Sequence, residues 1–455
     1  MPHSQTPFMD LTFHVQTYGC QMNKHDSERV YGVLENMGAT AVDTIEQADV
    51  VIFMTCCVRE AADVRLYGQV ASMKNLPMRE GSPLHKRIVA VGGCIGQRDG
   101  EKLFEALPHL NVVFGTQNLA SLPTLLLASY NEGTQQGEIL KTSDDFSSTL
   151  PTTREHFWAA WLPITVGCNN YCTYCIVPHV RGKERSRAME DIVKEAQHYV
   201  DAGVKEITLL GQNVNSYGRD LYGKPRFDDI LEAVAQTGIE RLRFATSHPK
   251  DLTDGVIDKF AHLENLMPYL HLPAQSGSNR VLKRMNRSYT IEHYRELIAK
   301  VKQACPGIAL STDIIVGFPG ETEEDFQATY DLIDEMKYNQ VFSFIYSKRE
   351  GTPAARWDDP TPHDVIHARF DRLLEAVARG AHASNQTAQD TDQLVLVEGT
   401  SKRDERMLVG KTPHNHTTHF PLPENKTLDD FLGTIVNVHI DEAKTWYLKG
   451  HLIGQ

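Results

Sequence analysis

Short apolar runs alternate with amphipathic stretches along the first third of the chain. Residues 11–16, 49–54 and 87–91 have the pattern of buried strands, and residues 27–37 and 59–73 have the periodicity of helices. Because strands that alternate with helices pair side by side in one sheet, this pattern predicts a parallel α/β domain. We place this N-terminal domain at residues 11–139.

The same alternation resumes after a stretch that has no periodicity. Residues 140–155 are rich in residues that favour turns, which predicts a linker. We place a second α/β domain at residues 156–387, with a long helix at residues 364–386 leading out of it. Its six strand candidates, each followed by a helical stretch or a polar loop, are 161–164, 205–210, 241–245, 268–272, 309–316 and 341–346.

The pattern changes character in the last 68 residues, 388–455. Short alternating runs at 394–398, 407–409, 434–440 and 446–449 predict a small β-barrel. The fold class predicted for the whole chain is therefore α/β, with a C-terminal β-barrel.

Composition indicates a globular protein of the cytoplasm. The chain has 455 residues, of which 41% are hydrophobic and 23% charged. The longest apolar stretch, around residues 119–130, is too short to span a bilayer, so we expect no membrane segment. Residues 1–5 have neither a basic start nor an apolar core, which argues against a secretory signal. Because the cytoplasm is reducing, we expect the eight cysteines to be ligands or free thiols and not disulfides.

The formal net charge of −13 argues against a protein that coats nucleic acid without specificity. Any RNA contact must therefore use local basic patches, although such runs are often only solvated surface. Two patches stand out, namely Arg181, Lys183, Arg185 and Arg187, and further along Arg280, Lys283, Arg284 and Arg287.

Three cysteines within eight residues form the most specific feature of the chain. Cys168, Cys172 and Cys175 follow a CxxxCxxC spacing. Three thiolates from one loop can hold three corners of an iron–sulfur cluster, whereas a closed zinc site requires four ligands. A zinc site completed by His179, or three buried thiols, are the alternatives.

With Tyr174 before the third cysteine, this loop resembles that of the radical S-adenosylmethionine (SAM) superfamily. The resemblance implies an open partial (β/α)6 barrel and a [4Fe-4S] cluster whose open iron binds SAM. It also implies that the cluster cleaves SAM to a radical. By the same resemblance, Gly211 and Gln212 lie where SAM is bound, and Ser247 and Gln275 are further candidate contacts.

Three more cysteines each follow a strand of the N-terminal domain. Cys20, Cys56 and Cys94 come after the first, second and third predicted strands, and the carboxyl ends of parallel strands meet at one edge of a sheet. Spacing alone leaves open that they are scattered thiols.

The whole chain resembles the methylthiotransferases, in which three such cysteines hold a second, auxiliary iron–sulfur cluster. Met54 stands where that family usually has Asn, which puts a hydrogen bond near the cluster in doubt. Cys57 directly follows Cys56 and is an alternative ligand.

The segments around the cysteines resemble those of the methylthiotransferases that act on N6-isopentenyladenosine in transfer RNA (tRNA). The chain reads TYGCQMN at 17–23, Val58-Arg59-Glu60 after the second cysteine, and GCNNYCTYCIVP at 167–178. The implied reaction uses two SAM molecules and two [4Fe-4S] clusters to add a methylthio group beside the anticodon. The alternatives are threonylcarbamoyladenosine in tRNA, a ribosomal-protein aspartate, or a non-catalytic iron–sulfur regulator that binds RNA.

The C-terminal barrel resembles the TRAM domain, an RNA-binding module. Residues 388–455 hold 7 Lys and Arg against 10 Asp and Glu, so RNA binding would depend on a local cluster. A structural or protein-docking barrel is the competing interpretation. We also expect the anticodon stem-loop as partner, an electron donor such as flavodoxin or ferredoxin, and a monomeric protein. The candidate RNA contacts of this barrel are Lys402, Arg403, Arg406 and Lys411.

Overall fold

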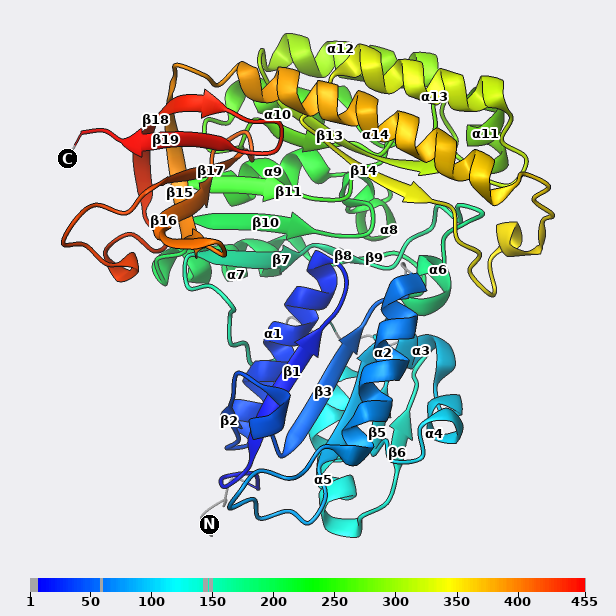
Figure 1. The fold of residues 1–455 in the computed structure, drawn as a ribbon, viewed down its shortest axis with the longest axis vertical. Helices are drawn as coiled ribbons and strands as arrows, with labels where there is room; N and C mark the ends of the chain where they lie inside the picture. Colours follow the sequence, from blue (N-terminus) through cyan, green and yellow to red (C-terminus); the bar gives the residue numbers. More distant parts are fainter. Residues whose placement is uncertain (1–6, 58–59, 142–145, 147–149, 455) are drawn as a thin grey trace. The chain divides into compact units, whose positions relative to one another are not determined.

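The computed structural model describes residues 7–57, 60–141, 146 and 150–454. Residues 1–5, Val58, Arg59 and much of the predicted linker lie outside the described residues. The chain forms two compact units, which are treated separately below (Figure 1). The first unit contains Met1–Glu155, Val166–Asn169 and Cys175–Arg185, and the second contains His156–Thr165, Asn170–Tyr174 and Ser186–Gln455.

Six parallel strands form the sheet described for the first unit. The central strands, β3 (Val50–Thr55) and β4 (Ile88–Gly93), are buried along their whole length, as expected for strands covered on both faces. The order across the sheet is β2 (Thr40–Ala41), β1 (Thr12–Thr17), β3, β4, β5 (Val112–Phe114) and β6 (Gln136–Glu138).

Helices cover both faces of this sheet. One core contains apolar side chains of α1 (Gln21–Asn36) and α5 (Leu122–Glu132), and the opposite core contains those of α2 (Glu60–Ser72). The predicted parallel α/β domain is therefore confirmed. The remaining helices of this unit are α3 (Cys94–Asp99), α4 (Lys102–Ala106) and α6 (Val177–Val180).

The second unit contains the predicted partial barrel. Six parallel strands form two sheets, ordered β11-β10-β7 and β12-β13-β14, and a bridge between Leu242 and Leu266 joins β11 to the segment before β12. The six βα units are confirmed. Their strands are β7 (Ala159–Pro163), β10 (Glu206–Leu210), β11 (Arg241–Phe244), β12 (Tyr269–His271), β13 (Ala309–Val316) and β14 (Gln340–Ile345).

Amphipathic helices wrap the outside of this barrel (Figure 1). In α12, for example, Ile291, Tyr294, Leu297, Ile298 and Val301 are buried at helical spacing. None of the described helices is both long enough and apolar enough to span a membrane. The principal helices are α7 (Met189–Asp201), α9 (Phe227–Ala235), α10 (Asp254–His262), α12 (Ile291–Ala304), α13 (Glu323–Met336) and α14 (His363–Gln386), and the short ones are α8 (Arg219–Tyr222) and α11 (Asn279–Arg284).

The last part of the second unit is a closed five-stranded barrel, as predicted. Its strand order is β15-β16-β17-β19-β18, and all neighbouring pairs are antiparallel except β17 and β19. Val395, Leu408, Phe420 and Val438 are fully buried in its core. The strands are β15 (Asp392–Ser401), β16 (Asp404–Lys411), β17 (Thr417–Pro421), β18 (Ile435–Ala443) and β19 (Leu448–Leu452).

Two arginines of β11 hold the small barrel against the larger one. Arg241 donates hydrogen bonds to the carbonyl oxygens of Leu394 (2.8 Å) and Lys411 (2.9 Å). Arg243 donates to those of Thr412 and Pro413, both at 3.0 Å. Four hydrogen bonds from charged donors to backbone oxygens fix this contact. Three of the acceptors lie at the end of β16 and the start of the loop before β17.

Candidate active site

Backbone hydrogen bonds fix the middle of the three-cysteine loop, which runs from β8 (Thr165–Val166) to α6. The Thr173 amide donates to the carbonyl oxygen of Met285 (3.1 Å), and its carbonyl oxygen accepts from the Ala354 amide (2.9 Å). Cys172 is buried, as is Cys168, and Cys175 is half-buried. Because its middle residue is tied on both sides, the loop presents Cys172 in a defined place.

An aromatic cluster packs beside this loop. The ring of Phe318 contacts Tyr174, Tyr346 and Trp357 edge-on, with centroids 6.3, 5.3 and 5.9 Å away. Phe318 is fully buried in the turn that follows β13. Tyr174, the aromatic residue of the cysteine motif, is therefore packed against the end of the barrel.

A buried arginine reaches the middle cysteine of the loop. Arg287 Nη1 lies 3.4 Å from Cys172 Sγ, in hydrogen-bonding geometry. Its Nη2 donates to the carbonyl oxygen of Pro273 (3.1 Å), and its Nε donates to the Tyr289 hydroxyl (3.2 Å). Sequence analysis placed Arg287 in a surface patch, because its nearest partners lie up to 115 residues away in the chain.

Four buried polar atoms cluster at the carboxyl ends of neighbouring barrel strands. Among the described residues they have no hydrogen-bond partner. Leaving such an atom unpaired costs about 1–3 kcal/mol, so four together indicate the site of a polar ligand. They are Thr165 Oγ1 after β7, Asn213 Oδ1 and Asn215 Nδ2 after β10, and Ser247 Oγ after β11.

The other ends of the two asparagine amides are held by protein. Asn213 Nδ2 donates to Asp251 Oδ2 at 2.7 Å, and Asn215 Oδ1 accepts from the amide of His248 at 2.9 Å. These bonds orient both amides and leave one oxygen acceptor and one nitrogen donor for a ligand. Sequence analysis missed Asn215 and Thr165 as contacts, although the polar run that contains residues 211–216 was visible.

The predicted SAM contacts lie at the same strand ends. A Cβ at Gly211 would collide with the Thr165 hydroxyl, so only glycine fits there. Ser247 is one of the unpaired atoms above. Gln275 is buried, and its backbone adopts a left-handed conformation with φ 66°. Its backbone amide donates to the carbonyl oxygen of Asp313 (2.8 Å). Gln212 is half-buried. SAM contact by these residues stays a prediction.

The three cysteines of the first unit also share an environment. A Cβ at Gly19, which has φ +115°, would lie 3.0 Å from Cys56 Sγ, so the backbone beside Cys20 closely approaches Cys56. The Arg181 side chain interacts electrostatically with both Cys94 and Cys20. The predicted convergence at the carboxyl edge of the sheet is thus consistent with these contacts.

A buried ion pair lies beside these cysteines. Arg181 Nη2 donates to Asp26 Oδ2 (3.0 Å) and to Asn23 Oδ1 (2.9 Å), and Arg181 is only 3% exposed. Burial favours a raised pKa for Asp26, but Arg181 and His25 outweigh it and hold that pKa below its ordinary value. Asp26 is therefore ionised and neutralises Arg181.

Cys56 and its neighbour Cys57 have different surroundings. Cys57 is fully buried in the apolar core on the α2 face, where its free thiol forms a hydrogen bond with the thiol of Cys94. This bond, and next in importance Arg181, lower the pKa of Cys94 although burial favours the opposite. Cys56 lies outside that core cluster, against Gly19. The choice of Cys56 as ligand stays a prediction.

The Met54 side chain packs in the apolar core on the α1 face and is 1% exposed. The polar role near the second cysteine is filled by Asn23, whose Nδ2 donates to the carbonyl oxygens of Tyr18 and Thr55, both at 2.7 Å. The departure at Met54 therefore leaves a satisfied hydrogen-bond network in place.

The residues present fit the predicted cofactors by their chemistry. Thiols are the ligands of iron–sulfur clusters, and the unpaired neutral polar atoms suit the polar groups of SAM. Within the described ranges, no three His, Cys, Asp or Glu side chains close around a single metal ion. That finding does not bear on a cubane cluster, in which each cysteine binds a different iron.

The predicted RNA contacts divide into exposed and buried side chains. Lys283, Arg284, Lys402 and Arg403 are exposed. Arg181 and Arg187 face the protein interior, where Arg187 pairs with Glu195 at 2.7 Å. A buried and paired guanidinium is not available to a phosphate in this conformation. Arg185 is half-buried and bonds to Gln117 Oε1 at 3.3 Å.

Lys411 and two nearby histidines lie where the small barrel meets the larger one. Lys411 Nζ donates to Thr417 Oγ1 (2.8 Å), and burial lowers the pKa of Lys411. Burial also lowers the pKa values of His414 and, to about 4, of His416. Both imidazoles are therefore neutral at pH 7, and this side of the barrel is not strongly cationic.

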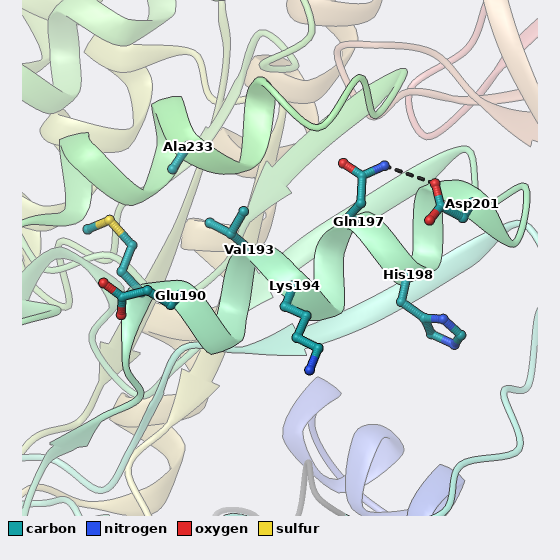
Figure 2. A pocket seen from close by; sticks show the side chains of 8 residues that line it. Glu190, Val193, Lys194, Gln197, His198, Asp201 and Ala233 are labelled. Carbon is teal, nitrogen blue, oxygen red and sulfur yellow. Dashed lines mark hydrogen bonds between the residues drawn. The ribbon is translucent and has the colours of Figure 1, made fainter.

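Two hollows lie away from the cysteine loop. One, of about 750 Å³, lies on the outer surface beside α7 and α9, and Figure 2 shows Val193, Gln197 and Asp201 on its wall. The other, of about 730 Å³, lies near the ends of α12, α13 and α14 and includes His416. Neither is lined by a predicted cofactor residue.

Family models match three parts of the chain. The Radical SAM superfamily matches residues 162–333, the Uncharacterized protein family UPF0004 matches residues 12–115, and the TRAM domain matches residues 390–453. These three segments correspond to the larger barrel, the N-terminal sheet and the small barrel.

Curated relatives match almost the whole chain. A protein of Clostridium botulinum (strain Loch Maree / Type A3) is 45% identical, with 97% of each chain covered. One of Carboxydothermus hydrogenoformans is 43% identical, with 98% of this chain and 100% of that protein covered. Both are named tRNA-2-methylthio-N(6)-dimethylallyladenosine synthase.

Solved structures support the fold. The radical SAM methyltransferase TsrM from Kitasatospora setae has a TM-score of 0.53 at 12% identity, with 76% of this chain and 77% of that chain covered. The cobalamin-dependent SAM radical enzyme OxsB has a TM-score of 0.52 at 14% identity. That match covers 81% of this chain and 56% of the OxsB chain.

Proposed function

Because this chain belongs to the family of tRNA-2-methylthio-N(6)-dimethylallyladenosine synthases, we propose that it adds a methylthio group to N6-isopentenyladenosine in tRNA. This base, also called N6-dimethylallyladenosine, lies next to the anticodon. The observation that carries the proposal is Cys172 of the three-cysteine loop, which Arg287 joins to the carboxyl end of β12 in a barrel whose strand ends carry four unpaired polar atoms. Bacterial relatives of full length bear the same activity in their names.

We propose two [4Fe-4S] clusters, one held by each cysteine set. Cys168, Cys172 and Cys175 would hold the first, and Cys20, Cys56 and Cys94 the auxiliary one. Bound clusters and two SAM molecules supply the radical chemistry that an unactivated aromatic C–H bond requires. The residues of the chain bind and orient these cofactors and are not themselves nucleophiles.

Binding of SAM is assigned to the carboxyl ends of the barrel strands. Ser247 Oγ and Asn215 Nδ2 can donate to its carboxylate or ribose oxygens, and Asn213 Oδ1 can accept from its amino group. Gly211 allows close approach of backbone to the ligand. Each such contact gives a partner to a buried polar atom that is otherwise unpaired. SAM binding should therefore stabilise the ordered arrangement of these side chains.

Recognition of the anticodon stem-loop is assigned to exposed cations. Lys283 and Arg284 lie on α11, whose neighbouring residue Met285 bonds to the three-cysteine loop. Lys402 and Arg403 lie in the turn between β15 and β16 of the small barrel. The target base must leave the stack to be modified, and phosphate contacts hold the flanking strand while it does.

Other partners follow from the same chemistry. The reaction requires an electron donor, and we propose a small redox protein such as flavodoxin or ferredoxin. The protein is proposed to act as a monomer in the cytoplasm, where its tRNA substrate is found.

An anaerobic assay with reconstituted protein tests the proposal. The substrate is an anticodon stem-loop that carries N6-isopentenyladenosine, with SAM and a chemical reductant present. Mass spectrometry should find the 2-methylthio product with the native protein and none with Cys172→Ala. If the native protein contains iron and cleaves SAM but never modifies this RNA, another substrate is indicated.

A further inference from the structure

Arg287 contacts Cys172, the middle cysteine of the loop. It is buried, and each of its side-chain nitrogens has a partner: Tyr289 for Nε, Cys172 for Nη1 and Pro273 for Nη2. The guanidinium therefore ties the middle cysteine to the carboxyl end of β12. Two of its three partners are neutral oxygen atoms.

The charge of Arg287 has no carboxylate partner among the described residues. Three other buried arginines pair with a carboxylate: Arg181 with Asp26 (3.0 Å), Arg187 with Glu195 (2.7 Å) and Arg369 with Glu323 (2.9 Å). A guanidinium stays charged in proteins, and a buried charge is stabilised by a nearby counterion. The charge of Arg287 is therefore available to an anionic group at the Cys172 sulfur.

His248, which lies nearby, does not supply that anion. Its ring contacts Tyr289 edge-on, with centroids 5.7 Å apart. Burial, and next Arg287, hold the pKa of His248 far below its ordinary value, so His248 is neutral. Burial raises the pKa of Tyr289, so its phenol is also neutral at pH 7. The group in contact with Arg287 that can carry negative charge is the Cys172 sulfur.

We propose that Arg287 is a positioning residue that donates to the Cys172 sulfur and raises the reduction potential of the cluster held by the three-cysteine loop. This inference depends on the proposed function only in that the loop holds an iron–sulfur cluster. Reduction adds negative charge to a cluster, and a nearby buried cation stabilises the reduced form. Hydrogen bonds to ligand sulfurs act in the same direction.

The same contacts predict that the two clusters differ in how strongly a buried arginine affects their reduction potentials. Arg181 interacts with Cys94, but its charge is offset by Asp26 at 3.0 Å. Arg287 has no such offset. Removal of the Arg287 charge should therefore shift the potential of its cluster more than removal of Arg181 shifts that of the auxiliary cluster.

The test is a redox titration followed by electron paramagnetic resonance. The background is a full-length chain with Cys20, Cys56 and Cys94 changed to Ala, so that only the loop cluster is titrated. Arg287→Met removes the charge, Arg287→Lys keeps it without the three-way hydrogen bonding, and Arg295→Met removes a surface charge. Arg295 is half-buried, with 38% of its side chain exposed, and pairs with Glu335 at 2.9 Å, which makes it a control away from the cysteine loop.

We expect Arg287→Met to lower the midpoint potential and Arg287→Lys to lower it less, while Arg295→Met leaves it unchanged. At a fixed applied potential the Met variant should have roughly tenfold less reduced cluster, which is about 59 mV for a one-electron couple. If the Met variant holds no iron, Arg287→Gln, which removes the charge but keeps a neutral donor, decides the question, because a midpoint equal to that of the parent overturns the proposal.

An unchanged midpoint in an iron-loaded Arg287→Met protein also overturns the proposal. Weaker SAM binding in that protein would then show that Arg287 acts on the carboxylate group of SAM. Failure of the proposed function is distinct, because the parent protein itself would lack the iron–sulfur signal.

Discussion

Single residues around the two cysteine sets differ in what they contact, and these contacts decide the effect of a substitution. Cys172 accepts a hydrogen bond from the buried Arg287. Cys56 lies beside Gly19, whereas Cys57 packs in the core with Cys94. Loss of Cys57 therefore removes core packing as well as a thiol, while loss of Cys56 removes a thiol that lies against the backbone of Gly19.

The neighbouring thiols Cys56 and Cys57 give a direct test of the auxiliary site. We expect Cys56→Ala to cleave SAM at the native rate but to form no 2-methylthio product, because only the auxiliary cluster is lost. Cys57→Ala should retain product formation, with some loss of stability from the core. Liquid chromatography of 5′-deoxyadenosine and of RNA nucleosides measures both activities.

The opposite pattern would contradict the assignment of Cys56. Product from Cys56→Ala and none from Cys57→Ala would identify Cys57 as the ligand. Iron content should then fall in Cys57→Ala and not in Cys56→Ala.

Local sequence signals set where the elements of the barrel begin. Helix α13 starts with a capping box, in which Thr322 accepts from the Asp325 amide and Asp325 accepts from the Thr322 amide at 2.9 Å. Asp325 also pairs with Arg280 of α11 and accepts from the Ser278 hydroxyl at 2.6 Å. One carboxylate thus joins the starts of two helices.

The stability contributed by Asp325 should depend on pH. Burial alone would raise its pKa, but the bonds from Arg280, Ser278 and Thr322 outweigh it and hold the pKa well below its ordinary value. Its stabilising effect is therefore complete above the unfolded pKa of about 3.9 and is lost progressively as the pH falls from there through the lowered pKa of the folded protein. We expect Asp325→Asn to cost about 1–3 kcal/mol at pH 7 and measurably less at pH 3.

Thermal unfolding of native and variant proteins at several pH values measures this effect. Asp331→Asn is the control, because exposed Asp331 on the same helix only accepts from Gln327 at 2.7 Å. A difference in Tm that stays constant from pH 7 to pH 3 would contradict the assigned role of Asp325.

The sequence predicted the elements with strong apolar patterns and missed the weak ones. β3 and β13 were predicted because strands buried on both faces of a parallel sheet have long apolar runs, which are easy to recognise in a sequence. β17 was missed, since Thr417–Pro421 contains one core side chain, Phe420, among threonine and histidine. β2, with two exposed residues, gives no signal at all.

Site residues were predictable where a local motif carries them and not where distant segments meet. The cysteine spacing and the glycine at Gly211 are local signals. Arg181 and Arg287 both resembled solvated charge, because their partners Asp26 and Cys172 lie 155 and 115 residues away. Charge pattern alone does not distinguish an arginine that binds phosphate from one that lies beside a buried thiol.

At the scale of the whole molecule, the chain combines three matched family segments of distinct chemistry. Cys20, Cys56 and Cys94 lie in the first unit, and the three-cysteine loop is divided, with Cys168 and Cys175 in the first unit and Cys172 in the second. The small barrel is held to the larger one by Arg241 and Arg243. Three of those bonds end at Lys411, Thr412 and Pro413, where β16 passes into the loop before β17. The turn between β15 and β16 carries the exposed Lys402 and Arg403.

Binding of the anticodon stem-loop should therefore weaken when Lys402 and Arg403 are both changed to Ala. Fluorescence anisotropy across a salt series should show lower affinity and a salt slope smaller by about 1–2, because phosphate contacts release counterions. Lys300→Ala with Arg295→Ala is the control, since the exposed Lys300 and the half-buried Arg295 both pair with carboxylates on the larger barrel. An unchanged slope in the Lys402 and Arg403 variant would favour a structural role for the small barrel.

The central claim is tested most directly by the nucleosides of tRNA from cells with and without this gene. Mass spectrometry should find that loss of the gene removes 2-methylthio-N6-isopentenyladenosine and that the unthiolated precursor accumulates. The native gene should restore the product, and the Cys172→Ala gene should not. An unchanged nucleoside profile in the cells without the gene would contradict the proposed function and direct attention to a protein substrate.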